Sequence, residues 1–535
     1  MLIRGAIRYV GALAALAALA GCSEYGARPH SPGQGGAAWV ELSTPHFRVV
    51  TDLSAVDAEG VAHEFEDELD AIDQVEFEHP RTSTEATTIV VFSDASDFHA
   101  FFPRLVAGEF RRSLPGDLEP SRFVVLHGVV TAGTRVACLH ELTHDLFERN
   151  FGPAPPWLNE GWAQYYSTIE VEGDRLRVGG ALPHLSFTSE NAPFNARAAD
   201  GSSVIALPIG WVPPPSELLA MDRRQFYAFT KERDPESEGS LRGTAVYMGA
   251  WALVHMMHDG PQQYQNRYRT FLEKVRDAQV QSAWESAFAG ISPADLDRDF
   301  RRYLFAQRLT LFEYPRRKAT QAWHVTRRAL PDSEVRILWS RLSPTNGGTE
   351  MAVKLDLDTA VTEAPDAPGG YYYRGLYWLH RGQLAAAEHD LLEAARLAPE
   401  DPRFLLGVLI LRIQQSDQTD AHVHPGDAIT QAAAPLVNVA TSAMQLRVLA
   451  LVYNDLGDHE RALGFARRAT ALAPIDSLSL DAEAQVVSSL GRDQEALELQ
   501  RSAVAFLPEG GDAPDIFKHL QAYEGRARNA PLPPP

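Results

Sequence analysis

The chain has 535 residues, of which 45% are hydrophobic and 22% are charged, as in an ordinary globular protein with several hydrophobic cores. Its formal net charge is −21 and its pI is near 5.3, so nucleic acid phosphates and anionic lipid headgroups would repel it. A nucleic-acid partner is therefore not expected.

The first 22 residues differ in character from the rest of the chain. Arg4 and Arg8 precede a short apolar run, Val10 to Leu19, which is typical of an export signal and too short to span a bilayer easily. Leu19-Ala20-Gly21-Cys22 resembles the lipobox of bacterial lipoproteins, and this resemblance implies cleavage before Cys22 and its acylation. An ordinary signal peptide with an incidental cysteine is the alternative. Because Ser23 rather than Asp follows Cys22, the resemblance implies a periplasm-facing anchor, in the outer membrane of a Gram-negative cell.

Residues 23–37 are rich in Pro, Gly and Gln and are interpreted as a flexible tether. If Cys22 is acylated, Cys138 is the remaining cysteine and no internal disulfide can form. An exported chain of this kind depends on its cores, and on a metal if it binds one, for its stability.

Residues 38–130 are expected to form a small α/β subdomain. Strands are predicted at Phe47–Thr51, Thr87–Phe92 and Phe123–Leu126, a helix at Asp57–Phe77, and a short helix capped by Asp94 and reaching Phe102.

Residues 131–315 are expected to form a second subdomain, in which several stretches have helical patterns. A helix starts near Thr134 with Leu139, Leu142 and Leu146 on its buried side, and the run Gly152–Pro156 must end it. A second helix opens near Trp157. Further helical patterns cover Ala245–Met257 and Asp295–Leu304.

The C-terminal region contains a repeat. Residues 316–365 show no sustained period and are interpreted as a connector, whereas residues 366–525 show a 34-residue spacing. Glycine, two alanines and proline recur in the same order at Gly382/Ala387/Ala394/Pro399, Gly457/Ala462/Ala469/Pro474 and Gly491/Ala496/Ala503/Pro508. This pattern resembles the tetratricopeptide repeat, an all-α solenoid. A degenerate repeat is expected between Gly382 and Gly457, with its insertion near Gln414–Asp427, and a Pro-rich tail covers residues 526–535.

The motif His140-Glu141-Leu142-Thr143-His144 lies on the predicted helix near residue 134. Residues four apart share one face of a helix, so both imidazoles could bind one Zn²⁺ with Glu141 beside the open position. Glu160 follows 16 residues after His144 in Trp157-Leu158-Asn159-Glu160-Gly161-Trp162-Ala163, where Gly161 and Ala163 permit close helix packing.

These two motifs together resemble the gluzincin superfamily of zinc metallopeptidases over roughly residues 39–315. The resemblance implies an α/β (α+β) metallopeptidase domain, with His140, His144 and Glu160 as zinc ligands and Glu141 as the general base. A stabiliser for the oxyanion is also required. Tyr247 is the candidate because gluzincins often use a downstream tyrosine, and Tyr165, Tyr166 and His184 are rivals.

The sequence departs from the gluzincin pattern in two places. Gln164 stands where some members have an Asp that orients a zinc histidine, so the support of the metal ligands must differ. The G-x-M-E-N segment of the aminopeptidase branch is absent from the sequence, which argues against an aminopeptidase.

Other histidine and cysteine positions favour structural roles. His422 and His424 fall in the repeat insertion, His255 and His258 lie three apart on a predicted helix, and Cys138 is expected to be an inert core thiol. The role of residues 179–240, which are rich in Pro, Ser and Gly, is open, and a loop over the cleft is one possibility.

Two functions from different classes follow. The first is a membrane-anchored zinc peptidase, most simply an endopeptidase, whose repeats bind a protein substrate or partner. The second is a repeat scaffold for envelope assembly whose zinc site is structural or vestigial. A zinc hydrolase acting on another bond is a third hypothesis, since the substrate pocket is not readable from sequence.

Overall fold

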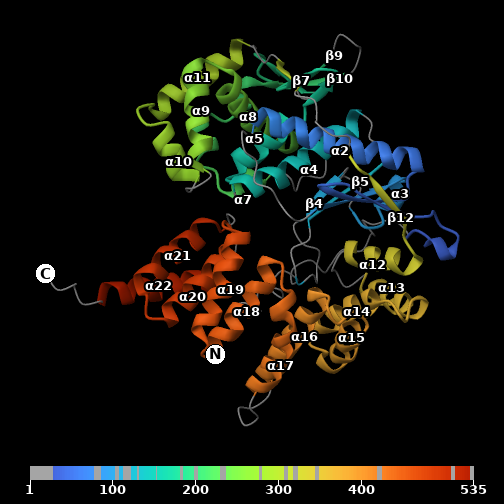
Figure 1. The fold of residues 1–535 in the computed structure, drawn as a ribbon. Coiled ribbons are helices and arrows are strands. Elements are labelled where there is room, and N and C mark those ends of the chain that lie inside the picture. Colours follow the sequence, from blue (N-terminus) through green and yellow to red (C-terminus); the bar gives the residue numbers. More distant parts are fainter. Residues whose placement is uncertain are drawn as a thin grey trace.

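The computed structural model describes most of the chain. The described residues are 28–76, 86–102, 108–111, 118, 122–128, 132–151, 154–180, 185–197, 203–228, 237–275, 280–306, 311–316, 323–343, 349–418, 425–507 and 513–529. They form an α/β part that is followed by a row of paired helices (Figure 1).

A six-stranded sheet lies in the α/β part, with the strand order β12-β1-β2-β3-β5-β4. Strands β2, β3 and β5 pair in parallel, and the other neighbours pair antiparallel. The strands are β1 (Val40–Ser43), β2 (Phe47–Thr51), β3 (Thr87–Phe92), β4 (Gly108–Arg111), β5 (Phe123–His127) and β12 (Thr326–Ala329). All six residues of β3 are buried, as expected for a central strand covered on both faces.

Alternating side chains of the parallel strands enter two different cores. Val49, Ile89 and Val91 pack with helices α2 (Ala55–Glu76) and α4 (Ala132–Phe151). Val50 and Val90 face the opposite way, into a core with α3 (Ala95–Phe98) and α12 (Asp332–Leu342). The sheet is therefore the middle layer between two helical layers.

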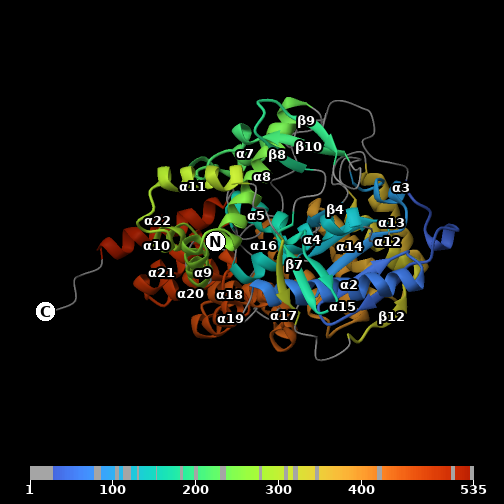
Figure 2. The ribbon, with the colours of Figure 1, turned by 90° about the horizontal axis from the view of Figure 1, so that it is seen from above.

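A helical lobe with two small sheets follows α4. The helices are α5 (Pro156–Tyr166), α6 (Pro215–Leu218), α7 (Arg223–Phe226), α8 (Glu238–Asp259), α9 (Gln262–Val275), α10 (Val280–Ala287) and α11 (Pro293–Ala306). The sheets have the orders β8-β10-β9 and β11-β7-β6, with β6 (Glu170–Glu172), β7 (Arg175–Val178), β8 (Leu185–Thr188), β9 (Phe194–Arg197), β10 (Ser203–Pro208) and β11 (Phe312–Pro315). Seen from above, β8–β10 lie on the same side of the molecule as α7 and α8 (Figure 2).

The C-terminal helices form consecutive antiparallel pairs, as the repeat predicted. The pairs are α14 (Pro368–His380) with α15 (Leu384–Leu397), α16 (Pro402–Gln418) with α17 (Pro425–Val439), α18 (Ala443–Asp455) with α19 (His459–Leu472), and α20 (Ser477–Ser489) with α21 (Asp493–Ala505); α22 (Pro514–Asn529) follows. The pair α16–α17 is the degenerate repeat expected between Gly382 and Gly457.

The repeated glycines and alanines have clear packing reasons. Gly382, Gly457 and Gly491 join the helices of three pairs with φ of +66°, +82° and +76°, a conformation that side chains with a Cβ rarely adopt. The six repeated alanines are fully buried where helices meet. The region is thus a tetratricopeptide-like helical solenoid.

The stretch expected to be a connector, residues 316–365, contains regular structure. It includes β12, which completes the sheet, α12, which covers one face of it, and α13 (Glu350–Glu363). All four residues of β12 are exposed, so the strand has no alternation of apolar and polar residues to reveal it. Helix α13 exposes Met351 and Leu355 and so carries no clean apolar stripe.

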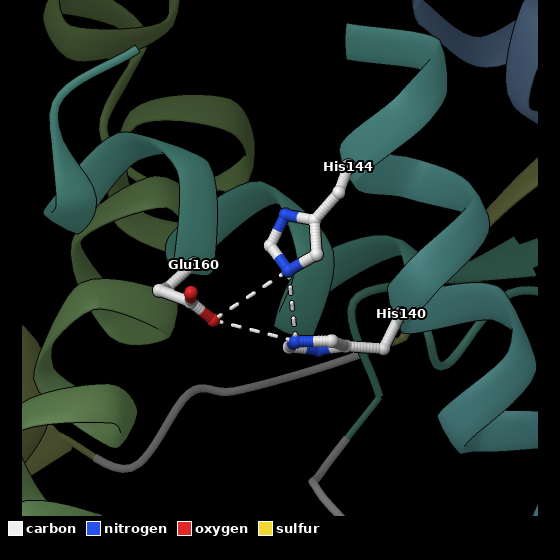
Figure 3. Close-up of side chains that lie close together, drawn as sticks. All are labelled: His140, His144 and Glu160. Carbon is white, nitrogen blue, oxygen red and sulfur yellow. Dashed lines mark hydrogen bonds and ion pairs between the residues drawn. The ribbon is translucent and has the colours of Figure 1, made fainter. Parts of the chain in front are cut away.

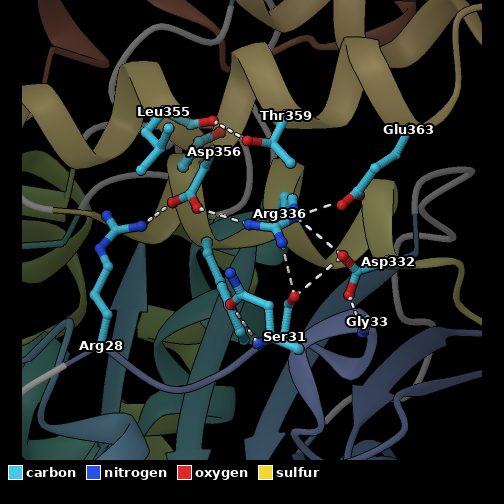
Figure 4. A network of polar contacts seen from close by, with 12 residues as sticks. Arg28, Ser31, Gly33, Asp332, Arg336, Leu355, Asp356, Thr359 and Glu363 are labelled. Carbon is cyan, nitrogen blue, oxygen red and sulfur yellow. Dashed lines mark hydrogen bonds and ion pairs between the residues drawn. The ribbon is translucent and has the colours of Figure 1, made fainter.

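Residues 28–37, expected to belong to the tether, are docked on α12 and α13 in the structure. The guanidinium of Arg336, a residue only 5% exposed, donates to Ser31 Oγ at 2.9 Å and to Asp332 at 3.0 Å (Figure 4). Asp332 also accepts from the Gly33 amide at 2.8 Å, and Arg28 pairs with Asp356. Residues 23–27 of the expected tether, the leader 1–22 and the tail from residue 530 lie outside the described residues.

No helix in the described part of the chain combines the length and apolar character needed to cross a membrane.

Candidate metal centre

Helix α4 carries both histidines of the first motif and is fixed to the sheet by a buried carboxylate. Asp145, the residue after His144, accepts from Thr87 Oγ1 on β3 at 2.7 Å and from Arg122 before β5 at 2.8 Å. Leu139 and Leu142 on the same helix are buried in the core below. These contacts set the rotation of α4, and the i, i+4 spacing then places His140 and His144 together.

Helix α5 brings Glu160 to the histidines. It begins at Pro156, a favourable first residue of a helix, and packs closely against α8. Gly161 makes this packing possible, because a Cβ there would lie 2.6 Å from Val254 Cγ2 and 2.8 Å from the Ala250 carbonyl oxygen. Trp162, the next residue, anchors the helix further by donating to Tyr268 Oη at 2.6 Å.

His140, His144 and Glu160 converge from these two helices (Figure 3). The two Nε2 atoms are 3.1 Å apart, and Glu160 Oε2 lies 3.3 Å from His140 Nε2 and 3.8 Å from His144 Nε2. The side chains are mostly buried, with 18%, 13% and 7% of their surfaces exposed. Within the described residues this is the one group of three or more His, Cys, Asp or Glu ligand atoms that lie this close together.

The donor set fits zinc. With metal–ligand bonds of about 2.0–2.1 Å at tetrahedral angles, neighbouring donors lie roughly 3.3 Å apart, close to the three separations observed. Two imidazole nitrogens and one carboxylate oxygen are also the ligand types of a catalytic zinc site with an open fourth position. His140, His144 and Glu160 are thus the residues that could hold a zinc ion.

Tyr227, which the sequence interpretation did not single out, also belongs to this centre. Its hydroxyl donates to Glu160 Oε1 at 2.6 Å, so the two oxygens of the carboxylate have different neighbours. Burial raises the pKa of the Glu160 carboxyl, but His144, His140 and Tyr227 outweigh burial and hold the pKa at about 2. Glu160 is therefore a carboxylate, as a metal ligand must be.

One ring nitrogen of His144 has no visible support within the described part of the chain. His144 Nδ1 is buried and has no hydrogen-bond partner among the residues that the structure describes. A zinc-binding histidine usually donates its other ring N–H to a carboxylate or carbonyl, which fixes the ring. A zinc ion held here would therefore depend more heavily on the support given to Glu160.

The other catalytic candidates lie at different places. Glu141 is half-buried on α4 beside His140. Tyr247 is half-buried on α8, with its ring 6.3 Å from that of Tyr227. Tyr165 and Tyr166 are fully buried, and the Tyr165 hydroxyl contacts His258 and Asp259.

The remaining candidates divide between the core and the parts not described. His255 is fully buried, with Nδ1 2.7 Å from Tyr303 Oη and Nε2 3.0 Å from the Gly179 carbonyl, which agrees with a packed core residue. Burial raises the pKa of the Cys138 thiol, which agrees with an inert thiol. Cys22, His184, His422 and His424 lie outside the described residues.

Comparisons with known proteins concern the repeats. No family model matches the chain, and no curated protein matches it. Among solved structures, a thermophilic tetratricopeptide-repeat protein of Thermus thermophilus is 17% identical, covering 36% of this chain and 96% of its own, with a TM-score of 0.29. The repeat protein YrrB, described as having an unusual peptide-binding site, is 14% identical, and the match covers 35% of this chain and 90% of YrrB, with a TM-score of 0.28. PilW, described as a type IV pilus biogenesis factor, is 9% identical, and the match covers 37% of this chain and 92% of PilW, with a TM-score of 0.29.

The helical solenoid is shown by the helix pairs of the structure itself. Membership of the gluzincin superfamily and catalytic activity stay predictions.

Proposed function

We propose that the chain is a zinc-dependent peptidase, most simply an endopeptidase of gluzincin type, whose solenoid binds a protein substrate or partner. The observation that carries the proposal is the convergence of His140 and His144 with Glu160 at separations that fit one zinc ion. The intact Glu141 supports a catalytic site over a structural one, because a structural zinc site has no use for a base.

Each residue has a defined task in this proposal. Zinc supplies Lewis acidity toward a carbonyl oxygen and lowers the pKa of water toward about 7. Glu141 takes a proton from water on its carboxylate and returns it to the amine that leaves. Tyr247 is the proposed donor to the oxyanion, from α8 beside Tyr227.

The proposed location follows from the lipobox-like segment. Acylation at Cys22 would hold the protein at the periplasmic face of an envelope membrane, in the outer membrane of a Gram-negative cell. Paired helices stacked in a row present an extended surface suited to peptides, so we assign substrate or partner binding to α14–α22.

A repeat scaffold with a structural or vestigial zinc site is the second candidate. It is favoured by the four helix pairs, which make up a domain large enough to bind a partner alone. The two candidates differ in what Glu141 does. A cellular phenotype that survives Glu141→Gln but is lost on removal of the repeats would establish the scaffold.

The first test is zinc content by elemental analysis of protein from Arg28 onward. We expect about one zinc per wild-type chain and much less in Glu160→Ala, because three protein ligands are needed for tight binding. No zinc in wild-type protein prepared without chelators would refute the metal site.

The second test is hydrolysis of a fluorogenic peptide library by zinc-loaded protein. Glu141→Gln should retain zinc and lose activity, since the base is gone while the three ligands are intact. Glu148→Gln, on the same helix, is the matched control and should keep activity. Unchanged hydrolysis in zinc-loaded Glu141→Gln would contradict the peptidase mechanism.

A further inference from the structure

We propose that Tyr227 is a positioning residue that binds one oxygen of Glu160 and thereby presents the other oxygen alone to the metal. The inference rests on the proposed zinc site and adds a requirement for a residue outside both motifs. Tyr227 lies in residues 179–240, whose role the sequence leaves open, so the inference gives this segment a role at the metal centre.

The two carboxylate oxygens of Glu160 are clearly distinguished in the structure. Oε1 accepts the Tyr227 hydroxyl at 2.6 Å, and Oε2 faces His140 Nε2 at 3.3 Å and His144 Nε2 at 3.8 Å. Glu160 is only 5% exposed, so water has little access to replace the tyrosine as the partner of Oε1. The hydrogen bond therefore fixes the rotation of the carboxylate about its last torsion, which is otherwise soft.

The turn that holds Tyr227 is itself well determined. It follows the single-turn helix α7, where Asp222 and Gln225 exchange hydrogen bonds between side chain and backbone at 2.8 Å and 2.9 Å. Phe226 is buried at 1% exposure and packs edge-on against Tyr247 on α8, with ring centroids 5.3 Å apart. The closed turn before Tyr227 and the buried Phe226 next to it therefore restrict where the backbone of Tyr227 can lie.

Such support matters more here because no described residue gives it to His144. His144 Nδ1 has no partner among the described residues, whereas the carboxylate of Glu160 is oriented by a side chain from another segment. Removing a partner of this kind lowers metal affinity by about 10- to 100-fold in zinc proteins. It also leaves both Glu160 oxygens available, so the metal can gain a fifth donor and lose its open tetrahedral position.

The experiment compares Tyr227→Phe with wild type by zinc titration against a chromophoric chelator. We expect the zinc dissociation constant to rise by about 10-fold or more. Tyr264→Phe is the matched control, because it removes a tyrosine bond to a carboxylate, Asp299 Oδ2 at 2.9 Å, in another part of the same core. That variant should bind zinc as wild type does.

Cobalt substitution gives a readout that a purely structural role would not change. Four-coordinate Co²⁺ absorbs much more strongly in the visible range than five-coordinate Co²⁺, since geometry governs these bands. We expect the wild-type band to weaken in Tyr227→Phe, as Glu160 binds through both oxygens, and to stay unchanged in Tyr264→Phe.

Each outcome decides the proposal. Equal zinc affinity and equal cobalt spectra in wild type and Tyr227→Phe would overturn it while leaving the zinc site intact. Wild-type protein that binds neither metal would overturn the proposed function, and this inference with it. If Tyr227→Phe fails to fold, Asp222→Ala opens the α7 turn with the hydroxyl kept, and unchanged zinc affinity in that variant would refute the positioning role.

Discussion

Gly161→Ala tests whether close contact between α5 and α8 positions Glu160. A Cβ at residue 161 would lie 2.6 Å from Val254 Cγ2, which can rotate away, and 2.8 Å from the Ala250 carbonyl oxygen, which cannot. An ordinary contact begins near 3.4 Å, so the two helices must separate by about 0.6 Å. This shift exceeds the roughly 0.2 Å tolerance of a metal–ligand bond.

The expected stability change follows from two opposing effects. Alanine is better than glycine inside a helix by about 1 kcal/mol, but overpacking a close contact costs about 1–3 kcal/mol. We therefore expect Gly161→Ala to lower the free energy of unfolding by about 1 kcal/mol and to weaken zinc binding. Gly60→Ala is the control, because Gly60 lies inside α2 of the same α/β part with no atom within 4 Å of the added Cβ. That variant should gain about 1 kcal/mol.

Urea unfolding followed by tryptophan fluorescence suits this comparison. Eight of the nine tryptophans precede residue 340, and the ninth is Trp378, so the signal reports mainly on the α/β part. A Gly161→Ala variant as stable as Gly60→Ala, with wild-type zinc affinity, would refute the packing argument.

Three further predictions concern other parts of the fold. Asp145→Asn should lower the free energy of unfolding by about 3 kcal/mol, because it removes the carboxylate that pairs with Arg122. An unchanged midpoint in urea unfolding would contradict this prediction. Burial raises the pKa of Glu68 to about 8 and of Asp73 to about 7, so the native state binds more protons than the unfolded chain. The free energy of unfolding of the wild type should therefore fall as the pH rises from about 4 to 8, and it should fall less steeply in Glu68→Gln. Equal slopes for the two proteins would be evidence against this. Gly457→Ala should lower the free energy of unfolding of the solenoid by about 1 kcal/mol, seen as a lower melting temperature, whereas the exposed Gly464→Ala should not.

The parts of the fold that the sequence predicted well are those with local signals. The repeat was visible because the glycines that need a positive φ and the alanines at helix crossings recur every 34 residues. The three main strands and α2, α4, α5, α8 and α11 followed from apolar periodicity and from the Gly/Pro break after α4. Asp94 was expected to cap a helix and does so, accepting from the Ser96 amide, although α3 ends at Phe98 rather than Phe102.

The parts that were missed depend on contacts distant in sequence. Tyr227 lies 67 residues after Glu160 in the sequence. It is identified by the contact of its hydroxyl with Glu160, and a periodic pattern in the sequence cannot predict such a contact. The available signal was the capped turn Asp222-Arg223-Arg224-Gln225 before an aromatic pair, which marks an ordered turn in a segment rich in Pro and Ser. Strand β12 was missed because its partner, β1, lies nearly 290 residues away and its side chains are exposed.

The way in which the two parts meet decides how the repeat domain can be tested. Helix α12 fills the core under the sheet with Val335, Leu338 and Trp339, and Arg336 on the same helix links α13 to the segment around Ser31. Removing the chain from residue 316 would therefore expose the sheet, and a loss of activity would say nothing about the repeats. A truncation after Glu363 keeps α12 and α13. It exposes mainly the side of α13 that packs against α14, where Gly370 contacts Val361. Only loss of protein-substrate cleavage in that variant, with small-peptide hydrolysis retained, would assign substrate binding to the solenoid.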